Sequence, residues 1–498
     1  MGGLMMEFWM EPEADKISKP SDLIGVILAA GKGVRAYPAT RFIPKELLDI
    51  GGKALIERNI EIMRDQLGIR KILIVIGHLG NQIIHSLNPK ALGVDLTYVE
   101  QKEQKGIGNA LLTVEKYVAK TRFVVMLADE FYVDSNHNQL HEFLDQDIDA
   151  VLMFKKEKNK AKIANNFTGQ IHNGKVLALI EKPAVPDSRF MGVGTYLLND
   201  KIFGYIRNTR PSMLRQEVEI TDVLSNMAKH ENVFACTLSG IYVNVNSTDD
   251  LNYANYALRE RFFDQYKVSV VIPAYNEEET ITEVVEDFKT HPAFDEVLVV
   301  DNNSRDATHA LAVHAGARVV TEKAQGYGCA MKCGLDEAKG DIIILTEADG
   351  SFQSKDIPKF LEYLKDCDMA IGTRTTRQMI EQGANMGSIL RWGNVLFGKI
   401  VEALWWNLEP RFTDVGCTYR AIWKTSYHKI RPYLKADGPE FAPEMMIAIL
   451  ICRRRIIEIP VSYRKRFGGE SKHSGHFRAH ARTAMKMLRI ILQHRFRL

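Results

Sequence analysis

Near its start the chain reads Gly25-Val-Ile-Leu-Ala-Ala-Gly-Lys-Gly-Val-Arg35, an apolar, β-rich run followed by a glycine-rich turn. Two more apolar runs, at 71–76 and 122–127, follow with helical patterns between them. Strands that alternate with helices predict an α/β domain with a mainly parallel sheet. The glycine-rich turn comes directly after the first strand, which is where open α/β sheets bind their ligands.

The same alternation of strands and helices restarts in the second half of the chain, with apolar runs at 268–272, 296–300 and 341–345. Because 498 residues exceed what one hydrophobic core usually serves, two α/β domains are expected. The junction has a helical pattern with neither Pro nor Gly, which predicts a helical linker. We expect four parts: an extension at 1–21, a first domain at 22–260, a second at 267–475 and a C-terminal helix at 476–498.

The overall composition excludes several classes of protein. Hydrophobic residues make up 46% and charged residues 26%, which argues against a disordered chain or a membrane bundle. The net charge of +3 is too small to favour nucleic acid as a partner. The six cysteines form no CxxC pair, so a reducing cytoplasm is expected. No run of 18 apolar residues and no signal-peptide pattern is found.

The C-terminal stretch 464–498 is strongly basic, since its one acidic residue is Glu470. Such an excess of Lys and Arg predicts an anionic partner. One helical face of this tail is apolar and carries Met485, Leu488, Ile491 and Leu492. That face could dock peripherally on the inner face of an anionic membrane, or it could pack against the catalytic domain. The pattern leaves both readings open.

The first glycine-rich turn has the features of a phosphate-binding loop. Gly31 and Gly33 let the backbone approach closely and aim N–H groups at phosphates. Arg35 and Lys45 add cations that offset the charge on a triphosphate. A GxG turn in isolation is more often a plain strand-to-helix turn, but Arg and Pro-Lys at this spacing favour phosphate binding.

Residues 28–48, followed by Gly52-Lys-Ala-Leu-Ile56, resemble the sugar-1-phosphate nucleotidyltransferases, whose signature is close to LAAGxGTRxxPxTxxxPKxLL. The resemblance extends over about 23–257, with Val34 where the family usually has Thr or Ser. It implies roles for further residues in chain order: base and sugar binding by Gln101 and Gly106, metal binding by Asp129, sugar-phosphate binding by Glu181, Lys182 and Gly194, and a second metal ligand at Asn244, where the family often has Asp.

The resemblance also implies a reaction. A sugar-1-phosphate oxygen attacks the α-phosphorus of an NTP, and pyrophosphate leaves. Mg²⁺ or Mn²⁺, together with Arg35, Lys45 and Lys182, would position the phosphates and neutralise their charge. The amide oxygen of Asn244 can serve as a ligand, because Mg²⁺ needs few protein ligands when phosphates and waters supply the rest.

In the second half, polar residues follow the ends of three expected strands. Pro273 and Glu277 follow the first strand, and Asp301 ends the next, where a carboxylate can hold base and ribose hydroxyls. The third is followed by Glu347-Ala-Asp349, two acids that can face a metal and a diphosphate. An acidic pair of this kind is, on its own, more often plain turn chemistry.

The stretch 268–472 resembles the family-two glycosyltransferases, particularly the polyprenyl-phosphate mannosyl and glucosyl synthases. The resemblance is carried by VVIPAYNEE, VVDNNSRDAT, KAQGYG, EADGSF, IGTR and IPVSYRKRFGGESK. Glu347 departs from the usual DxD, so the catalytic metal is expected chiefly on Asp349. The resemblance implies substrate binding by Lys323, a place near the sugar for Asp414, and phosphate binding by Arg374, Arg391, Arg466 and Lys472.

The two resemblances imply two GT-A/Rossmann-like domains in one bifunctional enzyme. The first would make an NDP-sugar from NTP and sugar-1-phosphate, and the second, an inverting transferase, would pass the sugar to polyprenyl phosphate. An acceptor that is already a phosphate needs little deprotonation, which fits the lack of an obvious His base. Alternatives are a non-catalytic nucleotide-sugar sensor in the first half, a soluble acceptor, or a scaffold. The sugar, the base and the oligomeric state stay open.

Overall fold

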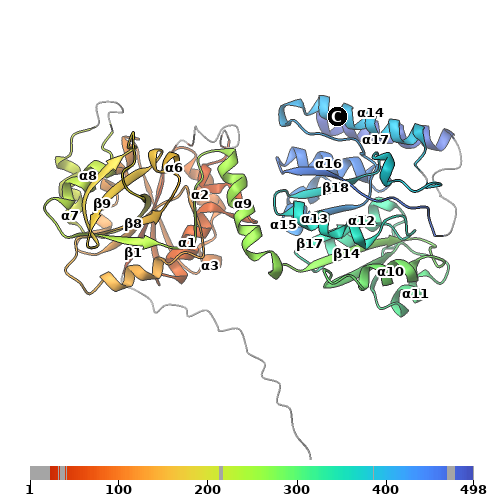
Figure 1. Cartoon of the computed structure of the whole chain (residues 1–498), viewed down its shortest axis with the longest axis horizontal. Helices are drawn as coiled ribbons and strands as arrows, with labels where there is room; N and C mark the ends of the chain where they lie inside the picture. The colour runs from red at the N-terminus through yellow and green to blue at the C-terminus, as the bar shows by residue number, and fades with distance from the viewer. Residues whose placement is uncertain are drawn as a thin grey trace, which may run out of the picture. The chain divides into compact units, whose positions relative to one another are not determined.

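The computed structural model describes residues 23–31, 33, 40, 42–211, 217–384, 386–467 and 477–496. The chain divides into two compact units, Met1–Leu258 and Arg259–Leu498. Each unit is built around a twisted β-sheet with helices on its faces (Figure 1). The predicted class, two α/β domains, is confirmed.

The first unit contains a nine-stranded sheet with the order β5-β4-β1-β6-β11-β8-β12-β10-β9. The strands β5, β4, β1 and β6 are parallel, whereas β11 runs antiparallel to both of its neighbours β6 and β8. The sheet is therefore mixed rather than mainly parallel. Its strands are β1 (Ile24–Ala29), β4 (Lys71–Ile76), β5 (Asp95–Glu100), β6 (Phe123–Leu127), β8 (Ala150–Lys156), β9 (Phe167–His172), β10 (Lys175–Glu181), β11 (Phe190–Leu198) and β12 (Val233–Leu238).

Strand β1 shows why this sheet is covered on both faces. Val26 and Leu28 belong to one buried cluster, while Ile27 and Ala29 belong to the cluster on the other side. Side chains alternate along a strand, so a run that is apolar at every position must be buried twice. The covering helices include α1 (Leu55–Asp65), α4 (Gly106–Leu112), α7 (Lys201–Asn208) and α8 (Ile220–Ala228).

Two short antiparallel strand pairs complete the end of the first unit that carries the glycine-rich turn. Strands β7 (Glu130–Val133) and β13 (Ile241–Asn244) pair antiparallel, with Asn244 opposite Glu130. Strands β2 (Asp49–Ile50) and β3 (Lys53–Ala54) follow the 3-10 turn η2 (Lys45–Leu47). The remaining helices of this unit are α2 (Gly80–Ser86), α3 (Pro89–Leu92), α5 (Glu115–Val118) and α6 (Lys160–Ala164).

The second unit has a seven-stranded sheet with the order β16-β15-β14-β17-β19-β18-β20. Its first four strands are parallel, and β19 enters antiparallel between β17 and β18. The strands are β14 (Val268–Ala274), β15 (Glu296–Asp301), β16 (Arg318–Thr321), β17 (Ile342–Leu345), β18 (Met369–Thr373), β19 (Arg420–Trp423) and β20 (Ile456–Pro460). The helices are α10 (Ile281–Lys289), α11 (Thr308–His314), α12 (Tyr327–Glu337), α13 (Ile357–Leu364), α14 (Ser388–Leu404), α15 (Lys424–Ile430), α16 (Phe441–Ile451) and α17 (Phe477–Phe496).

The predicted helical linker is present as α9 (Thr248–Phe262), followed by a 3-10 turn at Phe263–Gln265. Arg259 is buried at the beginning of the second unit. Its guanidinium pairs with Asp368 at 2.7 Å and lies over the ring of Trp423. The charge of this buried side chain is therefore compensated within the second unit.

The C-terminal helix α17 packs only part of its predicted apolar face against the second unit, and docking on a membrane stays a prediction. Ile491 is fully buried in the core of the second unit, where α17 packs against α16 and α14. Met485 and Leu488 of the same predicted face are exposed. Among the described residues, no helix is long and apolar enough to span a bilayer.

Candidate functional sites

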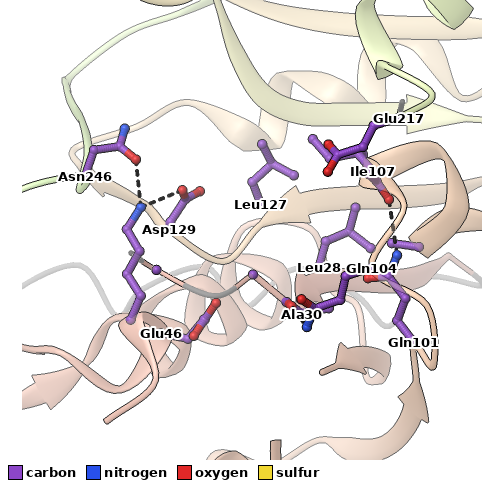
Figure 2. Close-up of a pocket in the computed structure, with 15 residues that line it drawn as sticks. Leu28, Ala30, Glu46, Gln101, Gln104, Ile107, Leu127, Asp129, Glu217 and Asn246 are labelled. Atoms are coloured by element: carbon purple, nitrogen blue, oxygen red, sulfur yellow. Dashed lines mark hydrogen bonds and ion pairs between the residues drawn. The ribbon is translucent and has the colours of Figure 1, made fainter. Parts of the chain in front are cut away.

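A cavity of about 480 Å³ lies at the carboxyl ends of the parallel strands of the first unit. The register aligns Leu28 with Leu127 and Ala29 with Ile76, so the loops after β1, β4 and β6 meet at one edge. Figure 2 shows Asp129 and Asn246 on one side of this cavity and Gln101 and Gln104 on the other. Its lining residues are Leu28, Ala30, Gly31, Gly33, Lys45, Glu46, Gln101, Gln104, Gly106, Ile107, Ala110, Leu127, Asp129, Glu217 and Asn246.

The ammonium of Lys45 is held between two acceptors at this cavity. It donates to Asp129 Oδ2 at 2.8 Å and to Asn246 Oδ1 at 2.9 Å. Lys45 is buried, whereas Asp129 keeps about a quarter of its side chain exposed (27%). The arrangement leaves one carboxylate and one cation in the lining of the cavity.

Asn244, expected as the second metal ligand, does not line the cavity. Its Oδ1 accepts a hydrogen bond of 2.7 Å from the amide of Asn246, which itself reaches Lys45. The side chain nearest to Lys45 and Asp129 from this strand end is therefore Asn246, two residues further on. A ligand role for Asn244 stays a prediction.

Gln101 follows β5 and spans the opposite end of the cavity. Its amide nitrogen donates to Gly106 O at 3.2 Å and to Asn109 Oδ1 at 2.9 Å. Both N–H groups are used in these bonds, so the carbonyl oxygen is the polar atom left for a ligand. Gly106 has a φ of +87°, and a Cβ there would lie 3.0 Å from the Cβ of Glu217. A glycine is required at this close approach.

Two acidic residues of the cavity, Glu46 and Glu217, were not predicted from the sequence. Glu46 follows Lys45 in the 3-10 turn and is buried, with Oε2 lacking a hydrogen-bond partner among the described residues. Burial raises the pKa of Glu46 to about 7, and the charge of Asp129 adds to the effect. Glu217 reaches the cavity from a loop far along the chain, and no local pattern marks it.

Glu181, Lys182 and Gly194, assigned above to the sugar phosphate, do not line the cavity. Lys182 forms a 3.7 Å ion pair with Glu181, and both are partly exposed. Gly194 donates its N–H to the carboxylate of Glu130 at 2.7 Å. A Cβ on Gly194 would lie 2.4 Å from Leu127, which lines the cavity. The absence of a side chain at Gly194 therefore lets Leu127 keep its place in the cavity wall.

Glu130 is the centre of a buried polar cluster next to Asp129. Besides the Gly194 N–H, its carboxylate accepts hydrogen bonds from the hydroxyls of Tyr242, at 2.7 Å, and Tyr132. Burial raises the pKa of Glu130 to about 7 despite these donors.

The predicted phosphate-binding loop is described in part. Gly31 and Gly33 line the cavity, while Val34 and Arg35 lie outside the described residues.

A second cavity, of about 440 Å³, lies at the corresponding edge of the second unit. It gathers the residues that follow β14, β15 and β17, as expected for an open α/β sheet. Of the predicted residues it contains Pro273, Glu277, Glu347, Asp349 and Arg466. The other lining residues are Ala274, Tyr275, Asn302, Gln325, Gly326, Tyr327, Ala330, Ala348, Gly438 and Pro439.

The acidic pair of this cavity is closely partnered, with Asp349 buried and Glu347 half-buried. Glu347 accepts a hydrogen bond of 2.7 Å from Thr418 Oγ1, and its pKa is raised by burial and by the charge of Asp349. Asp349 forms an ion pair with Arg466 Nε at 2.8 Å. The backbone of Phe467 also donates to Asp349 O at 3.2 Å, so this segment lies across the acidic pair.

Arg374 and Asp414 form a bidentate ion pair, with N···O distances of 2.9 and 3.0 Å. Asp414 is fully buried and also accepts the backbone N–H of Arg374 at 2.9 Å. The Asp414 N–H is in turn bound by the carboxylate of Glu458. Neither Arg374 nor Asp414 is among the residues lining the second cavity, so their substrate contacts stay predictions.

The remaining predicted residues of this unit are dispersed. Asp301 is buried and accepts the N–H of Ser304 at 2.9 Å, while its neighbour Asn302 lines the cavity. Lys323 is exposed and does not line the cavity, and Arg391 lies half-buried on α14. Lys472 lies outside the described residues.

A cation in either cavity would rely on few protein ligands. Among the described residues, no group of three or more His, Cys, Asp or Glu side chains is placed to hold a metal ion. Asp129 with a neighbouring amide, and Glu347 with Asp349, offer hard oxygen atoms that fit Mg²⁺ when phosphates and waters complete its shell.

Comparison with known proteins finds a family match within each unit. Residues 24–261 match the family described as nucleotidyl transferase. Residues 269–423 match glycosyl transferase family 2.

Individual relatives divide in the same way. The bifunctional protein GlmU of Methanococcus maripaludis is 32% identical over 239 residues, which cover 46% of this chain and 53% of the relative. The chain thus spans about half the length of that curated relative. The UTP–glucose-1-phosphate uridylyltransferase AglF of Haloferax volcanii is 29% identical, covering 47% of this chain and 96% of AglF. An uncharacterized glycosyltransferase of Mycobacterium bovis, Mb0553, is 32% identical over 42% of this chain and 91% of its own length.

The lysine–aspartate pair beside the glycine-rich turn and the acidic pair after β17 thus each fall within a matched region. The chain therefore carries a nucleotidyl transferase domain over 24–261. Through its second unit, which holds a glycosyl transferase family 2 domain over 269–423, it belongs to the glycosyltransferases.

Proposed function

We propose that the first unit makes an NDP-sugar from an NTP and a sugar-1-phosphate, and that the second unit transfers a sugar from an NDP-sugar to a phosphate acceptor. The observation that carries the proposal is the placement of Lys45 between Asp129 and Asn246, across one cavity from Gln101. That spacing suits a nucleotide whose phosphates lie at one end and whose base lies at the other.

In the first unit, the N–H groups of Gly31 and Gly33 would bind phosphate oxygens. The ammonium of Lys45 would exchange its ion pair with Asp129 for one with the α-phosphate. Negative charge grows on that phosphate as the sugar-1-phosphate oxygen attacks and pyrophosphate leaves. Asp129, with the amide oxygen of Asn246 or Asn244, would hold Mg²⁺, which supplies further charge neutralisation when bound.

The carbonyl oxygen of Gln101 favours a base that presents an N–H group. Uracil and thymine carry such a ring donor at N3 and guanine carries one at N1, whereas adenine presents a bare N1 and cytosine a bare N3. If a bare ring nitrogen faces the Gln101 carbonyl oxygen, both acceptors lack a hydrogen bond. This loss strongly disfavours binding of such a base. The uridylyltransferase activity in the name of AglF supports UTP as the first nucleotide to test.

In the second unit, an acceptor oxygen would attack C1 of the sugar with inversion. The bond from C1 to the diphosphate breaks, and a nucleoside diphosphate leaves. Asp349 and Glu347 would hold a divalent cation that balances the diphosphate charge, and Arg466 would exchange Asp349 for a phosphate oxygen. A polyprenyl phosphate is the proposed acceptor, supported by the resemblance to lipid-phosphate transferases and by the basic C-terminal helix.

The test is a reciprocal pair of activity measurements on the full chain. Pyrophosphate release is followed with a panel of NTPs and sugar-1-phosphates, and transfer is followed from supplied NDP-sugar. Lys45→Ala or Asp129→Asn should lower pyrophosphate release about a hundredfold and leave transfer intact. Asp349→Asn should abolish transfer and leave pyrophosphate release intact.

Lys53→Ala is the matched control, because Lys53 is an exposed lysine of the same region that pairs with Glu61 on the surface. It should retain both activities. Full pyrophosphate release in Lys45→Ala would refute the assigned site. If no NTP and sugar-1-phosphate pair gives pyrophosphate while NDP-sugar still binds, the first unit is a nucleotide-sugar sensor instead.

A further inference from the structure

Helix α14 and the turn after it expose three large apolar side chains to solvent. Trp392 is 67% exposed and Leu396 is 61% exposed. They are followed on the same helical face by Lys399 and Ala403, which are also exposed. Trp406, in the turn directly after the helix, is 72% exposed.

The opposite face of α14 is well packed, so the exposed row does not result from a loose helix. Val401 is fully buried, and a Cβ on Gly398 would lie 2.5 Å from Phe412 O. Single exposed apolar residues are common, but two indoles and a leucine exposed within one helix and the turn after it indicate a binding region. Trp is also the residue that concentrates at the interface between bilayer and water.

Helix α17 lies beside α14 in the second unit (Figure 1). The guanidinium of Arg495 lies 5.9 Å from the ring of Trp405, so the two helices meet near their C-terminal ends. On α17, Met485 and Leu488 are exposed beside the exposed cations Arg482, Lys486 and Arg489.

The charge on the two helices is almost entirely of one sign. Together they contain one acidic residue, Glu402, and it is engaged by Lys399 and by the backbone of Phe412. Their basic residues are Arg391, Lys399, Arg478, Arg482, Lys486, Arg489 and Arg495. Apolar side chains set among cations match an anionic lipid surface, which offers negative headgroups above an apolar layer.

We propose that Trp392, Leu396 and Trp406, together with the exposed side chains of α17, form a docking surface that holds the second unit on an anionic bilayer. The inference deepens the proposed transfer to a lipid phosphate. It assigns the contact chiefly to α14, which the sequence did not mark as a membrane element.

The position of α14 relative to the ion pair of Arg374 and Asp414 supports this reading. Gly416 lies against the other side of the helix, where an added Cβ would be 2.9 Å from Asn394 Oδ1 and 3.4 Å from Arg374 Nη2. A helix with its side chains is about 10–12 Å thick. Arg374 therefore lies roughly one helix diameter from the docking surface.

The experiment is sedimentation of the full chain with vesicles of phosphatidylglycerol and phosphatidylcholine, compared with pure phosphatidylcholine. We expect binding to the anionic vesicles that weakens with added salt. Trp392→Ser/Leu396→Ser should lower the partition coefficient at least about tenfold, since two large apolar side chains leave the interface. Adding Arg482→Gln/Lys486→Gln/Arg489→Gln to that variant should lower the partition coefficient further and remove most of its dependence on salt.

Tyr363→Ser is the matched control, because Tyr363 is an exposed apolar side chain of the second unit that belongs to α13. It should leave vesicle binding unchanged. Equal binding of the wild type and the Trp392→Ser/Leu396→Ser variant would overturn the proposal. So would a wild type that is a dimer and becomes a monomer in that variant, because the surface would then serve self-association.

Transfer assays separate this inference from the proposed function. The Trp392→Ser/Leu396→Ser variant should lose transfer to a polyprenyl phosphate embedded in vesicles but keep transfer to a short, water-soluble phosphate acceptor. If the wild type transfers to neither acceptor, the proposed function fails, while vesicle binding still decides the docking surface.

Discussion

Replacement of His137 by glutamine should reduce the acid sensitivity of the first unit. His137 is fully buried at the start of a 3-10 helix, His137–Phe143, with its ring against the edge of Tyr132 and Nδ1 2.8 Å from Ser135 Oγ. Burial lowers the pKa of His137 from 6.5 to about 3. The folded unit therefore keeps the ring neutral at a pH where the unfolded chain binds a proton.

The sign follows from proton binding in the two states. Between pH 6.5 and about 3 the unfolded chain holds more protons at this site, so the stability from His137 is complete above 6.5 and is lost as the pH falls. At about pH 5 the loss is RT ln(1 + 10^1.5), or about 2 kcal/mol. Glu46 and Glu130 act in the opposite direction, because their pKa values are raised to about 7 and their neutral forms favour folding as the pH falls.

The measurable quantity is therefore a double difference, in which the carboxyl effects cancel. Hydrogen-exchange mass spectrometry of β6 and β11 peptides, with rising urea, gives the free energy of unfolding of the first unit in the full chain. Lowering the pH from about 7.5 to about 5 should cost the wild type about 2 kcal/mol more than it costs His137→Gln. The same pH dependence in both proteins would refute the assignment of a buried, neutral ring.

Two further predictions concern the binding residues. Gln101→Glu removes the donor to Gly106 O, so the KM for NTP in the pyrophosphate assay should rise at least about tenfold; an unchanged KM would exclude Gln101 from nucleotide binding. Asp414→Asn leaves the charge of Arg374 poorly compensated, so chemical denaturation should show a loss of about 3 kcal/mol together with slower sugar transfer. The exposed carboxylate Asp336, also paired with an arginine, is the control: Asp336→Asn should cost under about 1 kcal/mol, and equal losses would contradict the role of burial.

The two α/β cores could be predicted because their signals are local. A run such as 25–30, apolar at consecutive positions, has to be buried on both faces, and a strand between helices satisfies that need. The antiparallel entry of β11 was not predictable in the same way. Its direction depends on pairing with β6 and β8, which lie far from it in sequence, so no pattern within Phe190–Leu198 reveals it.

The sites were predictable where a residue follows a strand end closely or belongs to a sequence motif. Asp129 and Gln101 follow strands and meet Lys45, a motif residue, at the first cavity, and Glu347 and Asp349 meet at the second. Asn246 was missed because its contact with Lys45 depends on how the chain turns after β13. Order within a motif therefore indicates which segments meet, and side-chain geometry decides which residue reaches the cavity.

The described tryptophans are distributed unevenly between the two units, so their fluorescence reports on one unit only. In the described part of the chain, every tryptophan belongs to the second unit: Trp392, Trp405, Trp406 and Trp423. Trp405 and Trp423 are buried, whereas the other two face solvent. Intrinsic fluorescence of these residues would thus be blind to nucleotide entering the first cavity. Contact with lipid would shift the emission of the two exposed rings to shorter wavelength, while the two buried rings would keep a constant background.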